Sequence, residues 1–297
     1  MSFRPLAAAV MVASAFFTIS AVASPLQLDV YNPGEKSIFP VTSTIVMGKH
    51  EAILVDAQFQ RNDAQALVHK IKASGRKLKT IYISHNDPDY YFGLDVLHAA
   101  FPDADIVATP QTVAAIKANK DGKMAYWGPI LKQNAPKEVI VPRPLSGNTL
   151  TLEGETIKII GLDGPSPDRT VLWIPSMQTI LGGVPIVANL HVWVADTQTF
   201  QSRQDWLKML EHFKEMHPKK VIPGHFLPDA HGKMPFDVGA INFTRIYLRA
   251  FEVEAALASN SGELIAAMRK RYPKLAHADS LELSAKVIKG EMKWPAH

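Results

Sequence analysis

A polar loop that follows a short apolar strand constrains this chain more than any other segment. Thr80–Ser84 contains β-branched and aromatic residues and predicts a buried strand. The chain then enters the loop 85–93, and a helix is expected from Leu94 to about Ala100. Imidazole and carboxylate groups at one strand end are donors that a borderline or hard cation accepts. A plain polar turn is the alternative, because Asn-Asp and Asp-Pro are common turn formers.

Strands and helices alternate on both sides of this loop. Paired strands are expected at 41–47 and 52–55, and a helix over 64–71, where apolar residues recur at i, i+3, i+4 and i+7. A helix is expected from Pro110 to about Lys117, and 120–129 is a candidate lid. Short strands between 149 and 181 predict an antiparallel meander, and the last sixty residues are mostly helical. This order predicts an α/β fold.

Composition excludes several classes of protein. The chain has 297 residues, 47% of them hydrophobic, so it can bury a sizeable core. The net charge is +4 and basic residues form no long run, which argues against a nucleic-acid partner. The sequence has no Gly-x-Ser-x-Gly elbow and no P-loop, so serine hydrolysis and nucleotide hydrolysis lack support.

The first two dozen residues differ from the rest. Leu6 to Ile19 is apolar, and Ala21-Val22-Ala23 fits a secretory cleavage site before Ser24. The stretch is nearly long enough to span a bilayer, but its alanine content and cleavage signature favour a signal peptide. We expect a periplasmic or secreted protein with no membrane attachment after cleavage. It has no cysteine, so a metal site must consist of histidine and carboxylate.

Three segments together resemble a known family. The strand ending in Asp56, the loop beginning at His85 and the late sequence Val-Ile-Pro-Gly-His225 resemble the metallo-β-lactamase superfamily, over about Phe39 to His225. The resemblance implies a four-layer αβ/βα sandwich with metals at the end of two sheets. We therefore expect a signal peptide at 1–23, a metallo-β-lactamase-like domain at 24–235 and a helical C-terminal extension packed on it at 236–297.

The family signature His-x-His-x-Asp-His is altered in this chain. His85 matches its first histidine, Asp87 stands at the second, Asp89 matches the aspartate and Tyr90 replaces the last histidine. His225 matches the final family histidine, which follows a later strand. The substitution of histidine by aspartate keeps a ligand, whereas Tyr90 deletes one.

Two later ligand positions are altered as well. No histidine precedes the expected strand 170–174, and Asp163 is the nearest replacement. The bridging aspartate is replaced by Gly183. The resemblance then implies one divalent metal per chain, zinc or else manganese or iron, held by His85, Asp87 and Asp163. Asp89 and His225 would complete a weak second site or support the first.

The resemblance implies an exported metal-dependent hydrolase of a small-molecule ester, lactone or amide, acting through a metal-bound hydroxide. Asp89 would hold or deprotonate the water, and Tyr90 or His191 would meet the oxyanion or leaving group. His191 and Tyr90 could equally be packed core residues, and Trp127 and Trp193 either line a pocket or belong to the core. The alternative function is a metal-free binding protein without turnover. The sequence leaves the substrate and the oligomeric state open.

Overall fold

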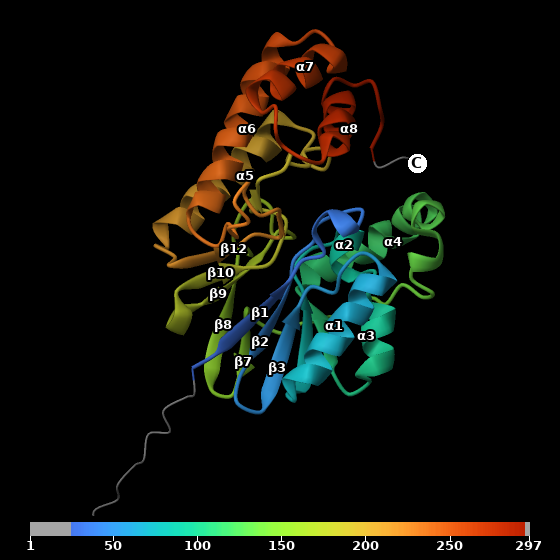
Figure 1. Cartoon of the computed structure of the whole chain (residues 1–297), viewed down its shortest axis with the longest axis vertical. Helices are drawn as coiled ribbons and strands as arrows, with labels where there is room; N and C mark the ends of the chain where they lie inside the picture. Colours follow the sequence, from blue (N-terminus) through green and yellow to red (C-terminus); the bar gives the residue numbers. More distant parts are fainter. Residues whose placement is uncertain (1–24, 295–297) are drawn as a thin grey trace, which may run out of the picture.

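Two β-sheets packed face to face form the centre of the molecule, and helices cover their outer faces (Figure 1). This computed structural model describes residues 25–294, so the expected signal peptide at 1–23 and Ser24 lie outside the described residues. The four layers run helix, sheet, sheet, helix, as the sequence predicted. The predicted αβ/βα sandwich is therefore confirmed.

The first sheet contains six strands in the order β1-β2-β3-β4-β5-β6. Its first three strands pair antiparallel, and the pairs from β3 to β6 are parallel because helices connect them. The strands are β1 (Gln27–Tyr31), β2 (Ser43–Met47), β3 (Glu51–Val55), β4 (Lys77–Ile83), β5 (Asp105–Ala108) and β6 (Arg143–Pro144). The helices of this half are α1 (Arg61–Ser74), α2 (Pro88–Tyr91), α3 (Leu94–Ala100) and α4 (Pro110–Leu131), with short 3-10 turns at Gly34–Lys36 and Lys132–Asn134.

The second sheet contains five strands in the order β12-β10-β9-β8-β7, and β11 and β13 form a separate parallel pair. Its strands are β7 (Thr149–Leu152), β8 (Glu155–Ile160), β9 (Val171–Ile174), β10 (Thr179–Leu181) and β12 (Lys220–Ile222), and the extra pair is β11 (Val187–Ala188) with β13 (His225–Phe226). The helices of this half are α5 (Phe200–Glu215), α6 (Gly239–Leu257), α7 (Ser261–Arg271) and α8 (Ala278–Ile288), and Pro175–Met177 forms a 3-10 turn.

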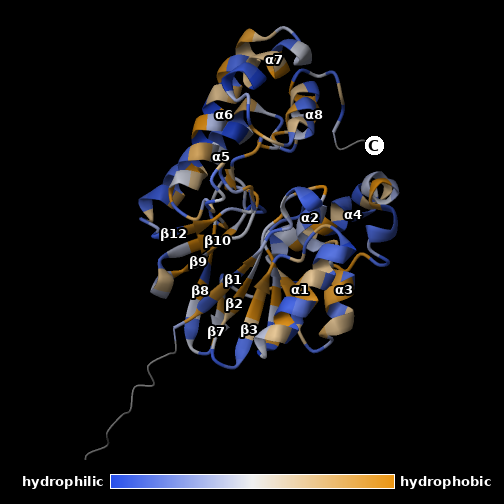
Figure 2. Ribbon diagram, viewed as in Figure 1, coloured by the Kyte–Doolittle hydropathy of each residue, from blue (hydrophilic) through white to orange (hydrophobic). Residues whose placement is uncertain are grey.

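Three apolar clusters hold the four layers together. Ile53 and Tyr82 of the first sheet meet Leu172 of the second in the cluster between the sheets. A second cluster lies under α1, α3 and α4, and a third joins the second sheet to α5–α8. Figure 2 shows the strands hydrophobic at the centre and the helices hydrophilic on their outer surfaces. Burial of apolar surface on both faces of each sheet therefore explains the layered architecture.

The C-terminal helices share a core with the rest of the second half. Tyr247 of α6 and Leu281 of α8 belong to the same buried cluster as Trp206 of α5. The boundary expected at residue 235 remains a prediction. Among the described residues, no helix is both long enough and apolar enough to cross a membrane.

The helix after Pro110 is longer than the sequence predicted. It continues through the candidate lid to Leu131 and carries Pro129 inside its last turns. Lys123, Trp127 and Leu131 are buried at a spacing of four residues, so packing of one helix face decides the local structure here. The segment 120–129 is therefore a helical wall of the site and not a loop over it.

Candidate functional site

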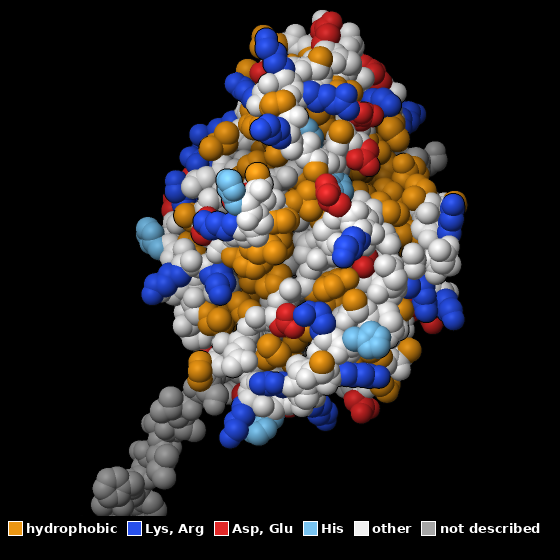
Figure 3. All heavy atoms as spheres, viewed as in Figure 1, with side chains coloured by type: hydrophobic (Ala, Val, Ile, Leu, Met, Phe, Trp, Pro, Cys, Tyr) orange, Lys and Arg blue, Asp and Glu red, His pale blue; other side chains and the backbone are white. Residues whose placement is uncertain are grey.

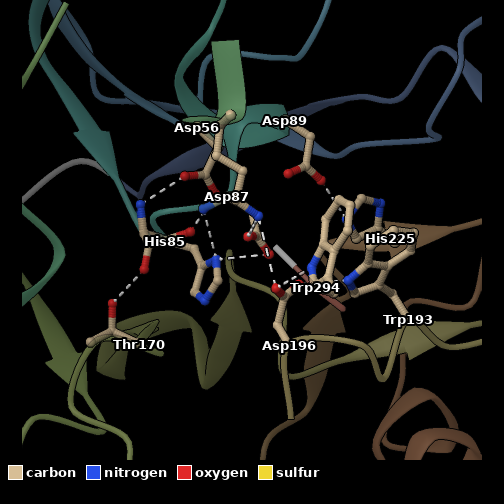
Figure 4. A network of polar contacts seen from close by, with 11 residues as sticks. Asp56, His85, Asp87, Asp89, Thr170, Trp193, Asp196, His225 and Trp294 are labelled. Atoms are coloured by element: carbon tan, nitrogen blue, oxygen red, sulfur yellow. Dashed lines mark hydrogen bonds and ion pairs between the residues drawn. The ribbon is translucent and has the colours of Figure 1, made fainter. Parts of the chain in front are cut away.

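Hydrogen bonds within the first sheet and from the second sheet fix the start of the polar loop. Ser84 donates to Asp56 through its backbone N–H at 2.8 Å and through its hydroxyl at 2.7 Å. The hydroxyl of Thr170, at the edge of the second sheet, donates to the Ser84 carbonyl at 3.0 Å (Figure 4). Burial raises the pKa of Asp56 to about 7, although hydrogen bonds from Ser84 and Gly183 oppose the shift. Asp56 therefore anchors the loop as a structural carboxyl.

A close backbone approach then turns the loop into α3. A Cβ atom on Gly93 would lie 2.1 Å from the Ala57 carbonyl oxygen, so only glycine fits. The Gly93 N–H donates to the Gln58 carbonyl, and the Ala57 N–H donates to the Tyr90 carbonyl. These contacts fix α2, which carries Asp89 and Tyr90.

His85 is buried at the start of the loop. Its Nδ1 accepts from the Asp87 N–H at 3.1 Å and lies 3.3 Å from the Asp87 carboxylate. Its Nε2 is buried and has no hydrogen-bond partner. His85 does not contribute to the pocket described below, so it supports the loop from behind.

Asp87 is neutralised by protein cations. Lys123 of α4 places its ammonium 3.4 Å from one Asp87 oxygen and 3.8 Å from Asp196. Burial raises the pKa of Asp87, but His85, Lys123 and Arg169 outweigh this effect and lower it well below its usual range. Burial also lowers the pKa of Lys123, and the surrounding carboxylates of Asp87, Asp196 and Asp89 raise it further than burial lowers it. The ammonium and the Asp87 carboxylate are both charged at neutral pH.

Asp89 and His225 form a second pair. The Asp89 carboxylate lies 2.9 Å from His225 Nε2, and both side chains keep some exposure. Because Asp89 accepts from Nε2, the neutral ring carries its proton there and Nδ1 is its basic nitrogen. The loop after β4 and the start of β13 thus come together, as the sequence predicted for these two segments.

Tyr90 lies between the two histidines. Its ring packs edge-on against His85 and His225, with ring centres 5.8 and 5.6 Å apart. It is fully buried, its hydroxyl has no partner, and burial together with Asp89 raises its pKa well above the usual value. A Cβ on Gly224 would lie 2.9 Å from this hydroxyl. Tyr90 is absent from the pocket wall, so the arrangement favours a packing role over the predicted contact with an oxyanion.

His191 lines the pocket but is tied to α6. Its Nδ1 lies 2.9 Å from the Tyr247 hydroxyl, and the side chain is almost fully buried. Burial, with help from Arg269 and His277, lowers the pKa of His191 to about 4. The imidazole is therefore neutral at neutral pH.

The structure places Asp163 apart from the other four predicted metal ligands. Asp163 is exposed in the turn between β8 and β9 and does not line the pocket, because this glycine-rich turn faces solvent. Arg169, at the end of the same turn, is the buried residue, and its guanidinium lies over Trp206 at 5.4 Å. Among residues 25–294, no three His, Asp or Glu side chains are grouped closely enough to hold one metal ion.

The donor chemistry also opposes a divalent metal. Asp87 is paired with Lys123 and Asp89 with His225, which leaves two imidazole nitrogens, Nε2 of His85 and Nδ1 of His225, as the free donors of these two pairs. A divalent cation here would meet the ammonium of Lys123 and the nearby guanidinium of Arg169. The predicted set of His85, Asp87 and Asp163 does not fit a metal, and that expectation was wrong for Asp163.

The position of the lost bridging aspartate is closed to any side chain. Gly183 has a φ of 79°, and a Cβ there would lie 2.2 Å from the Thr170 carbonyl oxygen. Its N–H instead donates to Asp56. The absence of a ligand at Gly183 therefore follows from the backbone.

An apolar pocket opens beside these pairs, between α4 and the C-terminal segment. Trp127 and Trp193 line it and also pack in the core under α4, so both roles that the sequence left open apply to them. Sequence reasoning missed Lys123, Asp196 and Trp294, because nothing in their local sequence marks them. The pocket wall comprises Phe39, Pro40, Asp87, Pro88, Asp89, Lys123, Trp127, Val184, Val187, Leu190, His191, Trp193, Asp196, Trp206, His225, His277, Ser280 and Trp294.

Asp196 joins three parts of this wall. It accepts from the indole N–H of Trp193 at 2.5 Å and from that of Trp294 at 2.8 Å (Figure 4). Burial and the neighbouring Asp87 carboxylate raise the pKa of Asp196. The pocket thus combines aromatic walls with a few oriented polar groups, which is typical of small-molecule sites.

Comparison with known proteins agrees with this architecture. The sequence model of the Metallo-beta-lactamase superfamily matches residues 38–225, more than half of the chain. The crystal structure of DIM-1 metallo-beta-lactamase is similar at 19% identity and a TM-score of 0.51, over 76% of this chain and 98% of that one. A metallo-beta-lactamase from Pontibacter korlensis shares 16% identity at a TM-score of 0.50, over 75% and 93% of the two chains. VMB-1 at pH 5.5 shares 18% identity at a TM-score of 0.51, over 80% and 96%. The chain belongs to the metallo-beta-lactamase superfamily.

Proposed function

We propose that this chain is an exported hydrolase of small esters, lactones or amides that works without a resident metal. Membership in the superfamily favours hydrolysis, whereas fold alone does not specify the reaction. The observation that carries the proposal is the Asp89–His225 pair at 2.9 Å, on the wall of a pocket that also holds the Lys123 ammonium.

The pair supplies a general base. Asp89 holds the His225 ring through Nε2, so Nδ1 accepts a proton from a water molecule as its oxygen adds to the substrate carbonyl carbon. The resulting alkoxide is stabilised by the ammonium of Lys123, which also feels the charge of Asp89. When the tetrahedral adduct collapses, the C–O or C–N bond breaks and the leaving group takes the proton back from His225. An ester gives a carboxylic acid and an alcohol, an amide gives an acid and an amine, and a lactone gives a single hydroxy acid.

Substitution of the base tests this assignment. We expect His225→Ala to lower kcat/KM for p-nitrophenyl acetate about 100-fold or more, which is the usual contribution of a general base. His98→Ala is the matched control, because His98 is an exposed histidine on α3, outside the pocket wall. Equal rates for wild type and His225→Ala, with both proteins folded, would refute the role of His225.

The second candidate is a binding protein without turnover. The buried Asp87–Lys123 pair favours it, since this pair neutralises the centre of the site without offering a free nucleophile. Ligand binding by wild type with no hydrolysis above the His225→Ala rate, across an ester, lactone and amide panel, would select this function.

Export is part of the proposal. The apolar stretch 6–19 and the Ala-Val-Ala sequence before Ser24 support a cleaved signal peptide. The periplasm or the medium would then be the site of action.

A further inference from the structure

The pocket is small, and one of its walls comes from the segment that follows α8. The space open to the centres of water-sized molecules is about 60 Å³. One water needs on the order of 10–15 Å³ by this measure, so this space holds only a few water-sized groups. Figure 1 shows α8 and the segment after it facing α4 across this part of the molecule.

Trp294 is the residue that this segment brings into the pocket. It is 6% exposed, although it lies in irregular structure beyond the last helix. Its indole N–H donates to Asp196 at 2.8 Å, and its carbonyl accepts from the Gln198 amide. Hydrogen bonds at both ends of the residue therefore hold the ring in one place.

The ring also packs against aromatic residues from both halves of the molecule. Its centre lies 5.1 Å from that of Tyr126 on α4 and 5.4 Å from that of Trp193, both edge-on. The Lys123 ammonium lies 5.1 Å from the ring centre, within the range of a cation–π contact. Trp294 thus closes the gap between α4 and the loop that carries Trp193.

On this side of the molecule, the position of Trp294 sets the size of the ligand that the pocket accepts. Figure 3 shows hydrophobic side chains gathered on the α8 side and along the middle of this face, with charged side chains scattered around them. A ligand chain larger than the free space of the pocket fits only if a wall residue is replaced by a smaller one or moves away. Close-packed walls resist such movement, because protein interiors are as dense as organic crystals.

We infer that Trp294 is the specificity-determining residue of this pocket and limits it to ligands with short acyl chains. The inference rests on the proposed function only in assuming that the carbonyl compound binds beside Asp89 and His225. Hydrolysis need not occur, because the size limit acts on binding. Removal of the indole opens apolar space in which each added methylene gains about fourfold in affinity.

A ligand series without a scissile bond tests the inference separately from turnover. Methyl ketones from 2-butanone to 2-decanone carry the carbonyl and the chain of an ester but cannot be hydrolysed. Their dissociation constants are measured by calorimetry for wild type, Trp294→Ala and Trp294→Phe. Trp173→Phe is the matched control, since Trp173 lies on β9 outside the pocket wall.

Wild type and Trp173→Phe should bind the short ketones at least tenfold more tightly than 2-decanone. Trp294→Ala should reverse this order, and Trp294→Phe, which keeps a ring of smaller size, should move the limit by one or two methylenes. Circular dichroism verifies that each variant is folded. If Trp294→Ala does not fold, the shift expected for Trp294→Phe alone tests the inference. The same chain-length profile in all proteins, or no ketone binding by any of them, overturns the inference. Loss of ester hydrolysis with the predicted ketone profile intact would refute only the proposed catalysis.

Discussion

Removal of the Lys123 ammonium tests the claim that protein cations neutralise the centre of the site. In Lys123→Met the carboxylates of Asp87 and Asp196 lose the cation that lies 3.4 and 3.8 Å away. Breaking a fully buried pair costs about 3–5 kcal/mol. The side chains of Asp87 and Asp196 are 14% and 20% exposed, so water offsets part of this loss. We expect the free energy of unfolding to fall by about 2–3 kcal/mol at pH 7.5.

Urea unfolding followed by tryptophan fluorescence measures this loss. Lys208→Met is the matched control, because Lys208 is 70% exposed and pairs with Asp205 on the surface of α5. Lys208→Met should lower the free energy of unfolding by less than about 1 kcal/mol. The double variant Lys123→Met/Asp87→Asn should recover at least half of the deficit, since it removes the stranded charge. A Lys123→Met protein as stable as the Lys208→Met control would refute the electrostatic argument, and so would a double variant with no recovery.

Three further predictions concern stability and export. Burial raises the pKa of Asp56 from its usual 3.8 to about 7 in the folded protein, so its contribution to stability is full below pH 4 and is lost as pH rises through 7. The stability of Asp56→Asn relative to wild type should therefore rise by about 3–4 kcal/mol between pH 4 and pH 8 in urea titrations, and a constant difference would contradict the shift. Gly183→Ala should destabilise the protein far more than Gly232→Ala. Both glycines have a φ of 79°, but the Cβ added at Gly183 would lie 2.2 Å from the Thr170 carbonyl oxygen, whereas the Cβ added at Gly232 meets nothing within 4 Å. Exported protein should begin at Ser24, and an intact mass that includes Met1 would contradict the predicted cleavage.

The helices and strands could be predicted from the sequence because the patterns that mark them are local. Apolar periodicity over 64–71 marks the face of α1 that covers the first sheet, and Pro110 marks the start of α4. Both signals depend on residues a few positions apart. The extent of α4 was not readable, because its second half becomes ordered through the burial of Lys123 and Trp127 against distant parts of the chain.

The site was only partly readable for the same reason. The pairing of Asp89 with His225 follows from motif positions that the family resemblance supplies. Asp163 was the nearest carboxylate in sequence, but the turn exposes it and buries Arg169 instead. Lys123 and Trp294 reach the pocket from segments with no motif, so only the packing of α4 against the C-terminal segment reveals them.

Hydrolysis after complete metal removal tests the central claim most directly. Protein is dialysed against EDTA and 1,10-phenanthroline, its metal content is determined by elemental analysis, and its rate with p-nitrophenyl acetate is measured before and after dialysis. The account predicts a metal-to-protein ratio far below one and an unchanged rate that still depends on His225. A rate that disappears on chelation and returns with one equivalent of zinc, manganese or iron would contradict it.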